Sequence, residues 1–237
     1  MGLSLRTVED QDRYARLLIY GAPGAGKTSL AATAPNPVWL DFENSTEALR
    51  KSFPTITVAG TAKELAQWDD VLKFILDLGK TDYETIVIDT ISSMNLAFMT
   101  EWMRQKFKAN SSADRHIARQ PDFRKVTNVM REIFLNLIQV EKHVVLIAHE
   151  KYLIDQDAPT VIKQIRPSLP PAAESSVEQL VNECFYLEKK TTGMGAAKKV
   201  TRTLTISSEG KIFAKNRQGF EQTTIDEPTW EKIYKWD

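Results

Sequence analysis

The sequence predicts an α/β fold built on a largely parallel sheet. Short runs with strand character alternate along the chain with stretches in which apolar residues recur at helical spacing, the pattern of repeated β-α-β units. The 237 residues include 42% hydrophobic and 26% charged side chains, enough for a substantial core. The strand-like runs are Arg16–Tyr20, Val38–Asp41, Thr85–Asp89 and His143–Ala148.

Two amphipathic segments between these runs are expected to be helices that cover the sheet. Thr61 and Glu64 form a capping-box pattern at the start of the first, and Gly79 is its expected end. The second helix directly precedes the fourth strand. The first apolar stripe comprises Leu65, Trp68, Leu72, Ile75 and Leu76, and the second comprises Val126, Val129, Met130, Ile133, Phe134, Leu137 and Ile138.

The last third of the chain has a different character. Asn182–Lys189 and Val200–Ser207 resemble strands separated by a polar loop, and the short strand Lys211–Lys215 is expected after a turn. These runs predict an antiparallel extension at one edge of the sheet. Because no linker or repeat divides the chain, we expect a short arm at 1–14 and a single domain at 15–237.

Charge and cysteine content exclude several classes of protein. Thirty-one lysines and arginines balance 31 aspartates and glutamates, so any nucleic-acid surface must be local. The lone Cys184 excludes a disulfide framework or a cysteine zinc site, and the three histidines form no ligand cluster. No apolar run is long enough to span a bilayer, and the polar start is not a signal peptide, so we expect no membrane partner and a cytoplasmic location.

The strongest signal in the sequence is a phosphate-binding loop, GAPGAGKTS, which follows the first strand and matches G-x-x-x-x-G-K-[ST]. Backbone N–H groups of the loop and of the short helix after it would surround phosphate oxygens. Lys27 would reach the β- and γ-phosphates, and the Thr28 hydroxyl would bind Mg²⁺. We therefore expect the chain to bind a nucleoside triphosphate as its Mg²⁺ complex. The loop consists of Gly21, Ala22, Pro23, Gly24, Ala25, Gly26, Lys27, Thr28 and Ser29.

Two acidic residues at strand ends complete the expected nucleotide site. Asp89 ends the run ETIVID and is the expected second holder of the Mg²⁺ shell. Glu43 lies just past the second strand, where a carboxylate could act as general base on the attacking water. The alternative is that Asp41 and Glu43 only cap the next helix.

The order of these segments resembles the RecA-like ATPase core. WLDFE after the phosphate loop, VIDT as the metal strand and LIAHEK as the following strand carry the resemblance. It implies that Glu43 is the catalytic glutamate and that His149 senses the γ-phosphate, although many members have Gln at that position. The alternative for His149 is a strand-end histidine with local hydrogen bonds. The resemblance also implies ATP rather than GTP.

A segment near the C-terminus, IFAKNRQGF, resembles the K-N-R or K-x-R segment that RecA-like recombinases and DnaB-type helicases place at subunit interfaces. The likeness implies that Lys215 and Arg217 reach the γ-phosphate held by a neighbouring subunit, so the ATPase would be a homo-oligomer, either a ring or a filament. The alternative is a solvated basic turn. With IRPSLPP and AKNR, the chain is most similar to phage nucleotide-binding proteins of the Sak type, which implies recombination or annealing in the host cytoplasm.

The same resemblance implies single-stranded DNA as a partner, with a single-strand DNA-binding protein as a further one. Between Arg104 and Lys125 seven lysines and arginines stand against two aspartates, and Phe107 and Phe123 could stack on bases. Tyr152, in the segment after His149, offers a further aromatic ring on which a base could stack. The alternative is exposed basic helices with the two phenylalanines anchored in the core. The candidate DNA-binding cations are Arg104, Lys106, Lys108, Arg115, Arg119, Lys151, Lys163 and Arg166.

The function implied by these features is a DNA-stimulated ATPase of the recombination class. Three rivals remain open: a helicase or motor of the DnaB or AAA+ kind, a nucleotide-switched binding module with little hydrolysis, and a small-molecule kinase. A helicase would be expected to bring an extra loading domain. A kinase would need an arginine-rich lid and an acceptor pocket, and neither can be identified in the sequence.

Overall fold

The computed structural model describes residues 13–110, 114, 116–156, 158, 160–193 and 199–234. The predicted arm, except for its last two residues, and Arg115 lie outside these ranges. In the described part of the chain no helix is both long and apolar enough to cross a bilayer.

The ten strands found in the described residues belong to one sheet. They are β1 (Arg16–Gly21), β2 (Pro37–Asp41), β3 (Thr57–Val58), β4 (Thr85–Asp89), β5 (His143–Ile154), β6 (Ile162–Pro167), β7 (Glu183–Thr192), β8 (Lys199–Thr205), β9 (Lys215–Asn216) and β10 (Thr224–Asp226). The main path runs β10-β8-β7-β1-β5-β4-β2-β3, with β6 paired to β5 and β9 to β7. From β7 to β3 all neighbours are parallel, whereas β8, β9 and β10 are antiparallel. The predicted fold class, a mainly parallel sheet with a C-terminal antiparallel extension, is confirmed.

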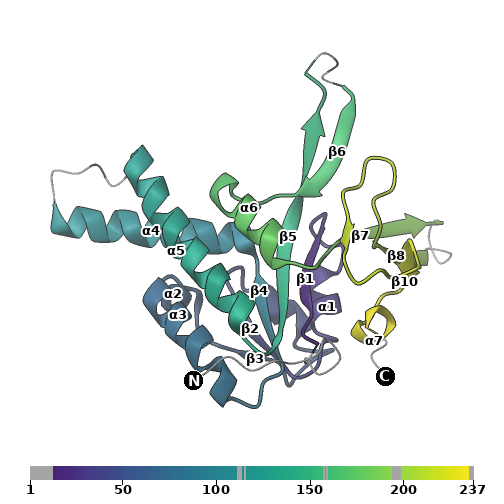
Figure 1. Cartoon of the computed structure of the whole chain (residues 1–237), viewed down its shortest axis with the longest axis horizontal. Helices are drawn as coiled ribbons and strands as arrows, with labels where there is room; N and C mark the ends of the chain where they lie inside the picture. Colours follow the sequence, from purple (N-terminus) through teal and green to yellow (C-terminus); the bar gives the residue numbers. More distant parts are fainter. Residues whose placement is uncertain are drawn as a thin grey trace, which may run out of the picture.

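Helices cover both faces of this sheet (Figure 1). Side chains alternate along the strands, so Leu18 and Leu146 face one layer of helices while Leu17 and Val145 face the other. The first layer contains α3 to α6, and the second contains α1 and α7. The helices are α1 (Lys27–Ala31), α2 (Ala62–Leu65), α3 (Trp68–Asp77), α4 (Ile91–Ala109), α5 (Gln120–Gln139), α6 (Pro171–Leu180) and α7 (Trp230–Ile233), with 3-10 turns η1 (Ser45–Leu49) and η2 (Leu78–Lys80).

The helix predicted from Thr61 to Gly79 is two helices, and this expectation was wrong in detail. The capping box is present, but α2 ends after one turn because Gln67 is extended, with φ −83° and ψ 96°. The break resets the helical phase, so Val71, Ile75 and Leu78 are buried and Leu76 is 61% exposed. Ile138, at the end of the second predicted stripe, is likewise exposed, and Gly79 lies inside η2.

The C-terminal strands differ from the prediction in two respects. The run predicted as Asn182–Lys189 pairs parallel to β1, so the antiparallel extension begins only at β8. The strand predicted at Lys211–Lys215 is reduced to β9. Residues 211–213 form only isolated bridges: Ile212 bridges to Glu209 and to Ile165, and Ile165 pairs with the carbonyl of Lys211 and the N–H of Phe213.

β5 extends well beyond its predicted end at Ala148. It pairs in parallel with β1 and β4, then continues to Ile154 and turns back through β6 as an antiparallel hairpin. The β5–β6 hairpin projects from the body of the protein (Figure 1). Tyr152, Ile154 and Val161 on this hairpin are exposed. The segment after His149 is therefore largely strand.

Glu183, at the start of β7, is a carboxylate buried in the core. It is fully buried, its Oε2 accepts a hydrogen bond from the Tyr234 hydroxyl at 3.2 Å, and its Oε1 has no hydrogen-bond partner among the described residues. Burial raises the pKa of Glu183 to about 7, although Tyr234, Arg16 and Lys215 favour the ionised form. The folded state therefore binds a proton more tightly here than the unfolded chain does.

A pH dependence of stability follows from this carboxylate. Between the ordinary pKa of 4.5 and the folded value of about 7, the folded state binds more protons, so the free energy of unfolding should fall as pH rises. The expected fall is about 2–3 kcal/mol over this range. Glu183→Gln should flatten this fall, measured by urea unfolding from pH 5 to pH 8. The exposed Glu84→Gln serves as control. An unchanged pH profile in Glu183→Gln would contradict the expectation.

Candidate nucleotide-binding site

The phosphate loop connects β1 to α1, as the sequence predicts. Gly21 is required by packing, since a Cβ there would lie 2.2 Å from the carbonyl oxygen of Leu187 on β7. Gly26 has a φ of +106°, a conformation that favours glycine, and directly precedes the helix. The Lys27 ammonium donates to the carbonyl oxygens of Gly21 and Ala22, both at 2.9 Å. Its side chain is thereby held across the loop.

A stability prediction follows from the contact at Gly21. Gly21→Ala should lower the free energy of unfolding by about 1–3 kcal/mol, because the new methyl group overlaps backbone that cannot rotate away. Urea unfolding measures the change. Gly79→Ala is the matched control, since a Cβ at Gly79 meets nothing within 4 Å. A Gly21→Ala variant as stable as the wild-type chain would contradict this interpretation.

The two predicted Mg²⁺-binding residues lie together. The Thr28 hydroxyl donates to Asp89 Oδ2 at 2.9 Å, and the Ser45 hydroxyl donates to the same oxygen at 2.6 Å. Asp89 is 1% exposed, and burial raises its pKa to about 6, against the opposing hydrogen bonds of Ser45 and Thr28. A carboxylate and a hydroxyl oxygen are the hard ligands that Mg²⁺ prefers beside phosphate oxygens, so this donor set fits the ion.

Asp41 and Glu43, which the sequence could not separate, have different roles. Asp41 caps η1, because its carboxylate accepts hydrogen bonds from the backbone N–H groups of Ser45 and Thr46 at 3.0 and 2.9 Å. The Glu43 backbone N–H also donates to Asp41 Oδ1 at 3.1 Å, but the Glu43 carboxylate takes no part in this cap. Its Oε1 accepts hydrogen bonds from the hydroxyls of Thr90 and Ser93, both at 2.6 Å. The capping alternative therefore describes Asp41 but not Glu43.

His149 is the third polar group around Glu43. Its Nε2 lies 3.2 Å from Glu43 Oε1, and the β1–β5 register places it opposite Gly21. Burial raises the pKa of Glu43, but the hydrogen bonds from Ser93, Thr90 and His149 outweigh it and leave the pKa below its ordinary value. Glu43 is thus an ionised carboxylate at neutral pH, held in a defined orientation.

These residues line one pocket of about 390 Å³. It contains the phosphate loop, both acidic groups, His149 and five residues that were not predicted as site residues, among them Ser45 and Arg202. Ser45 follows Glu43 in the segment ENST, and its proximity to a predicted acid was the only available signal. Arg202 on β8 carried no motif signal at all. The lining is Pro23, Gly24, Gly26, Lys27, Thr28, Ser29, Glu43, Ser45, Ala48, Leu49, Asp89, Thr90, His149 and Arg202.

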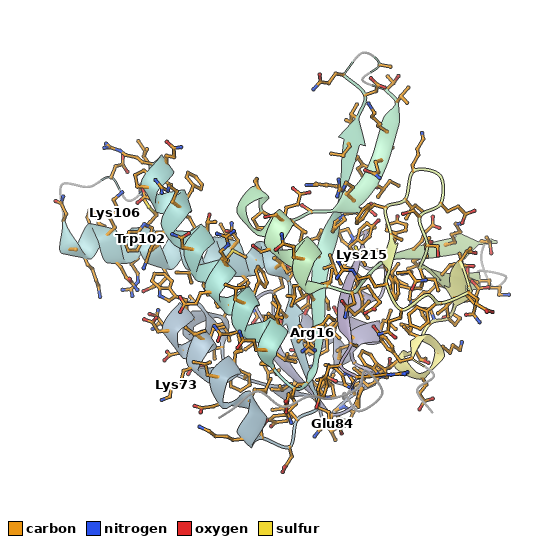
Figure 2. All side chains as sticks on the ribbon, viewed as in Figure 1. Arg16, Lys73, Glu84, Trp102, Lys106 and Lys215 are labelled. Atoms are coloured by element: carbon orange, nitrogen blue, oxygen red, sulfur yellow. The ribbon has the colours of Figure 1, made fainter. Side chains whose placement is uncertain are left out.

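Lys215 and Arg217 are predicted to reach the γ-phosphate held by a neighbouring subunit. Both lie outside this pocket in their own chain. The Lys215 ammonium donates to the carbonyl oxygen of Val181 at 2.6 Å, on the opposite side of the molecule from Lys106 (Figure 2). Arg217 is exposed on the loop that follows β9. Their action on a neighbouring subunit stays a prediction.

The candidate DNA-binding cations fall into two groups. Four are engaged within the chain: Arg104 with Glu101 at 2.6 Å, Lys106 with Asp122 at 2.8 Å, Lys151 with Glu174 at 3.1 Å, and Arg166 over the ring of Phe213 at 4.5 Å. Lys106 lies beside Trp102 (Figure 2), whose indole N–H donates to the same Asp122. Lys108, Arg119 and Lys163 are exposed, as are Phe107 and Phe123.

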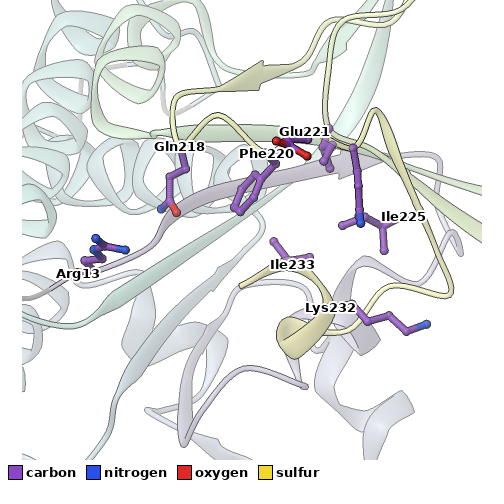
Figure 3. A pocket seen from close by; sticks show the side chains of 9 residues that line it. Arg13, Gln218, Phe220, Glu221, Ile225, Lys232 and Ile233 are labelled. Atoms are coloured by element: carbon purple, nitrogen blue, oxygen red, sulfur yellow. The ribbon is translucent and has the colours of Figure 1, made fainter. Parts of the chain in front are cut away.

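A second pocket of about 370 Å³ lies beside α7 (Figure 3). Phe220, Ile225 and Ile233 form its apolar wall, and Arg13 and Lys232 lie at its edge. It shares no lining residue with the phosphate-loop pocket.

Comparison with known proteins supports the identification of a phosphate-binding loop in this chain. A family model described as AAA domain matches residues 13–218. A solved structure of a KaiC-like protein from the hyperthermophilic archaeon Pyrococcus horikoshii is similar at 16% identity and a TM-score of 0.46, over 81% of this chain and 77% of that one. No curated protein matches the chain. Since the family model spans most of the chain and includes the whole nucleotide pocket, the chain belongs to the AAA domain family, as a nucleotide-binding phosphate-loop ATPase domain.

Proposed function

We propose that the chain hydrolyses Mg·ATP and acts on single-stranded DNA in phage-type recombination or annealing, as a homo-oligomer. The observation that carries the hydrolytic part is the orientation of Glu43. Its carboxylate is fixed by Thr90, Ser93 and His149 in the pocket that contains the phosphate loop. A nucleotide switch with little hydrolysis would not require this arrangement.

Each part of the site has a defined task in this reaction. Lys27 and the loop N–H groups bind the β- and γ-phosphates, and Glu43 accepts a proton from the attacking water. Thr28 and Asp89 would hold Mg²⁺, which when bound neutralises charge on the β- and γ-phosphates. Because an ionised carboxylate can only accept, His149 would donate its Nε2–H to Glu43 and so orient the base. In the oligomer, Arg217 and Lys215 would balance phosphate charge from the neighbouring subunit.

The DNA-binding part of the proposal is supported by the β5–β6 hairpin. β5 carries His149 at the pocket and continues without interruption into the hairpin, where Tyr152 and Lys163 are exposed. An aromatic side chain and a cation exposed on the same hairpin are suited to a stacked base and its phosphate. The resemblance to Sak-type proteins supports the choice of single-stranded DNA.

ATP hydrolysis with and without single-stranded DNA, at two salt concentrations, tests the proposal. We expect DNA to stimulate turnover, less so at high salt. A Tyr152→Ala/Lys163→Ala variant should lose the stimulation and keep basal turnover, whereas Lys73→Ala on α3 should behave as the wild-type chain. Turnover indifferent to DNA would overturn the DNA assignment.

A separate variant tests the proposed action of Arg217 and Lys215 on the nucleotide of a neighbouring subunit. Arg217→Ala is cleaner than a change at Lys215, because Lys215 is bonded to Val181 within its own chain. Arg217→Ala should lower turnover at protein concentrations where the oligomer forms, with the exposed Lys211→Ala as control. Full activity of Arg217→Ala would exclude a role for Arg217 at the γ-phosphate of the neighbouring subunit.

A further inference from the structure

Arg202 is a second cation in the nucleotide pocket, and it comes from the antiparallel extension rather than from any of the sequence motifs. A Cβ built on Gly26 would lie 2.8 Å from Arg202 Nε and 3.2 Å from its Cδ. The arginine side chain therefore packs against the loop residue directly before Lys27. It also lines the same pocket as Glu43 and Asp89.

The backbone of Arg202 is fixed on both sides. β8 lies between β7 and β10, with Arg202 opposite Lys189 in the ladder. On the other side, the Arg202 N–H donates to Glu227 Oε1 and the Arg202 carbonyl accepts from the Glu227 N–H, both at 2.8 Å. Arg202 is thus held against the phosphate loop by the fold itself.

The Arg202 guanidinium is incompletely paired: the side chain is 39% exposed and forms a long ion pair with Glu227. Its Nε is buried and has no hydrogen-bond partner among the described residues. The acid nearest to it, Glu227, has Oε2 at 3.8 Å from Nη1, beyond hydrogen-bonding distance. A buried donor left unpaired is costly, so a ligand that supplies an acceptor at this point gains a hydrogen bond without first breaking one.

We infer that Arg202 binds the phosphate chain of the nucleoside triphosphate held by its own subunit. This inference rests on the nucleotide binding in the proposed function. A guanidinium offers only donors, in a planar fork that matches phosphate oxygens. Its contact with Gly26 places it beside the backbone that surrounds the phosphates. Arg202 thus acts in cis with Lys27, whereas Arg217 is proposed to act on the neighbouring subunit.

Calorimetric titration of the full chain with Mg·ATP tests the inference. Arg202→Ala and Arg202→Gln should both weaken binding by about tenfold to a hundredfold, the usual size of a lost charge-assisted hydrogen bond. Arg202→Lys keeps the charge and should recover part of the affinity. Lys199→Ala, an exposed cation on the same strand, is the matched control and should bind as the wild-type chain does. Thermal unfolding without nucleotide checks that the variants remain folded.

The outcomes separate this inference from the function on which it rests. If the wild-type chain does not bind Mg·ATP, the proposed function fails. If Lys27→Met loses binding while Arg202→Ala retains wild-type affinity, the nucleotide site stands and the role of Arg202 is overturned. If Arg202→Gln binds as well as Arg202→Lys, charge is not what matters, and the phosphate assignment is also overturned.

Discussion

Glu43→Gln is expected to retain Mg·ATP binding and to lower the rate of hydrolysis by about 10²–10⁴-fold, the usual contribution of a general base. The amide can still accept the hydrogen bonds that Thr90 and Ser93 now donate to the carboxylate. It cannot take a proton from water. Single-turnover phosphate release, combined with equilibrium nucleotide binding, measures the two effects separately.

Glu47→Gln is the control for this experiment, because Glu47 lies on the neighbouring η1 turn and pairs only with the exposed Arg50. It should hydrolyse ATP at the wild-type rate. Normal turnover by Glu43→Gln would remove the general-base assignment. It would favour the nucleotide-switch alternative, in which the phosphate loop is needed and Glu43 is not.

Lys27→Met should weaken Mg·ATP binding by on the order of a hundredfold, since a charge-assisted hydrogen bond to phosphate is lost. Methionine keeps an apolar stem of similar length in a residue that is only 6% exposed. The variant also loses the hydrogen bonds to Gly21 and Ala22. Binding of a fluorescent ATP analogue, with competition by ATP, measures the change.

Lys51→Ala, on the exposed surface after η1, is the control for this variant and should bind nucleotide normally. The melting temperature without nucleotide must also be compared, because Lys27 packs within the loop. An unchanged affinity in a folded Lys27→Met chain would mean that the loop does not hold phosphates.

The sequence was sufficient to predict the four central parallel strands, β1, β2, β4 and β5, and the site residues that follow them. The phosphate loop, Asp89 and Glu43 each follow a strand at a short, fixed offset, and the carboxyl ends of parallel strands meet at one edge of a sheet. Local sequence and fold class together therefore bring these three features into one pocket. His149 follows the same logic, since it lies opposite Gly21 in the register of β1 and β5.

Other features depend on contacts between distant segments, which no local pattern encodes. Arg202 reaches the pocket only because β8 pairs with β7 and β7 pairs with β1. The partners of Lys106 and Lys151 lie on other helices, so counting basic residues could not show that these cations are already paired. The break at Gln67 leaves the apolar spacing looking continuous, and it was missed for that reason.

Because β5 is continuous, a movement of the strand at the nucleotide pocket is transmitted to the projecting hairpin. Ile154 is the fifth residue after His149, a distance of about 16 Å along extended chain. A rotation of about 5° at the pocket would therefore carry the end of the strand through roughly 1.5 Å. The parallel pairing with β1 and β4 holds the base of this arm, whereas its far half pairs with β6 and is joined to α6 by the Lys151–Glu174 ion pair. A small rearrangement around Glu43 and His149 on loss of the γ-phosphate would be amplified at Tyr152 and Ile154.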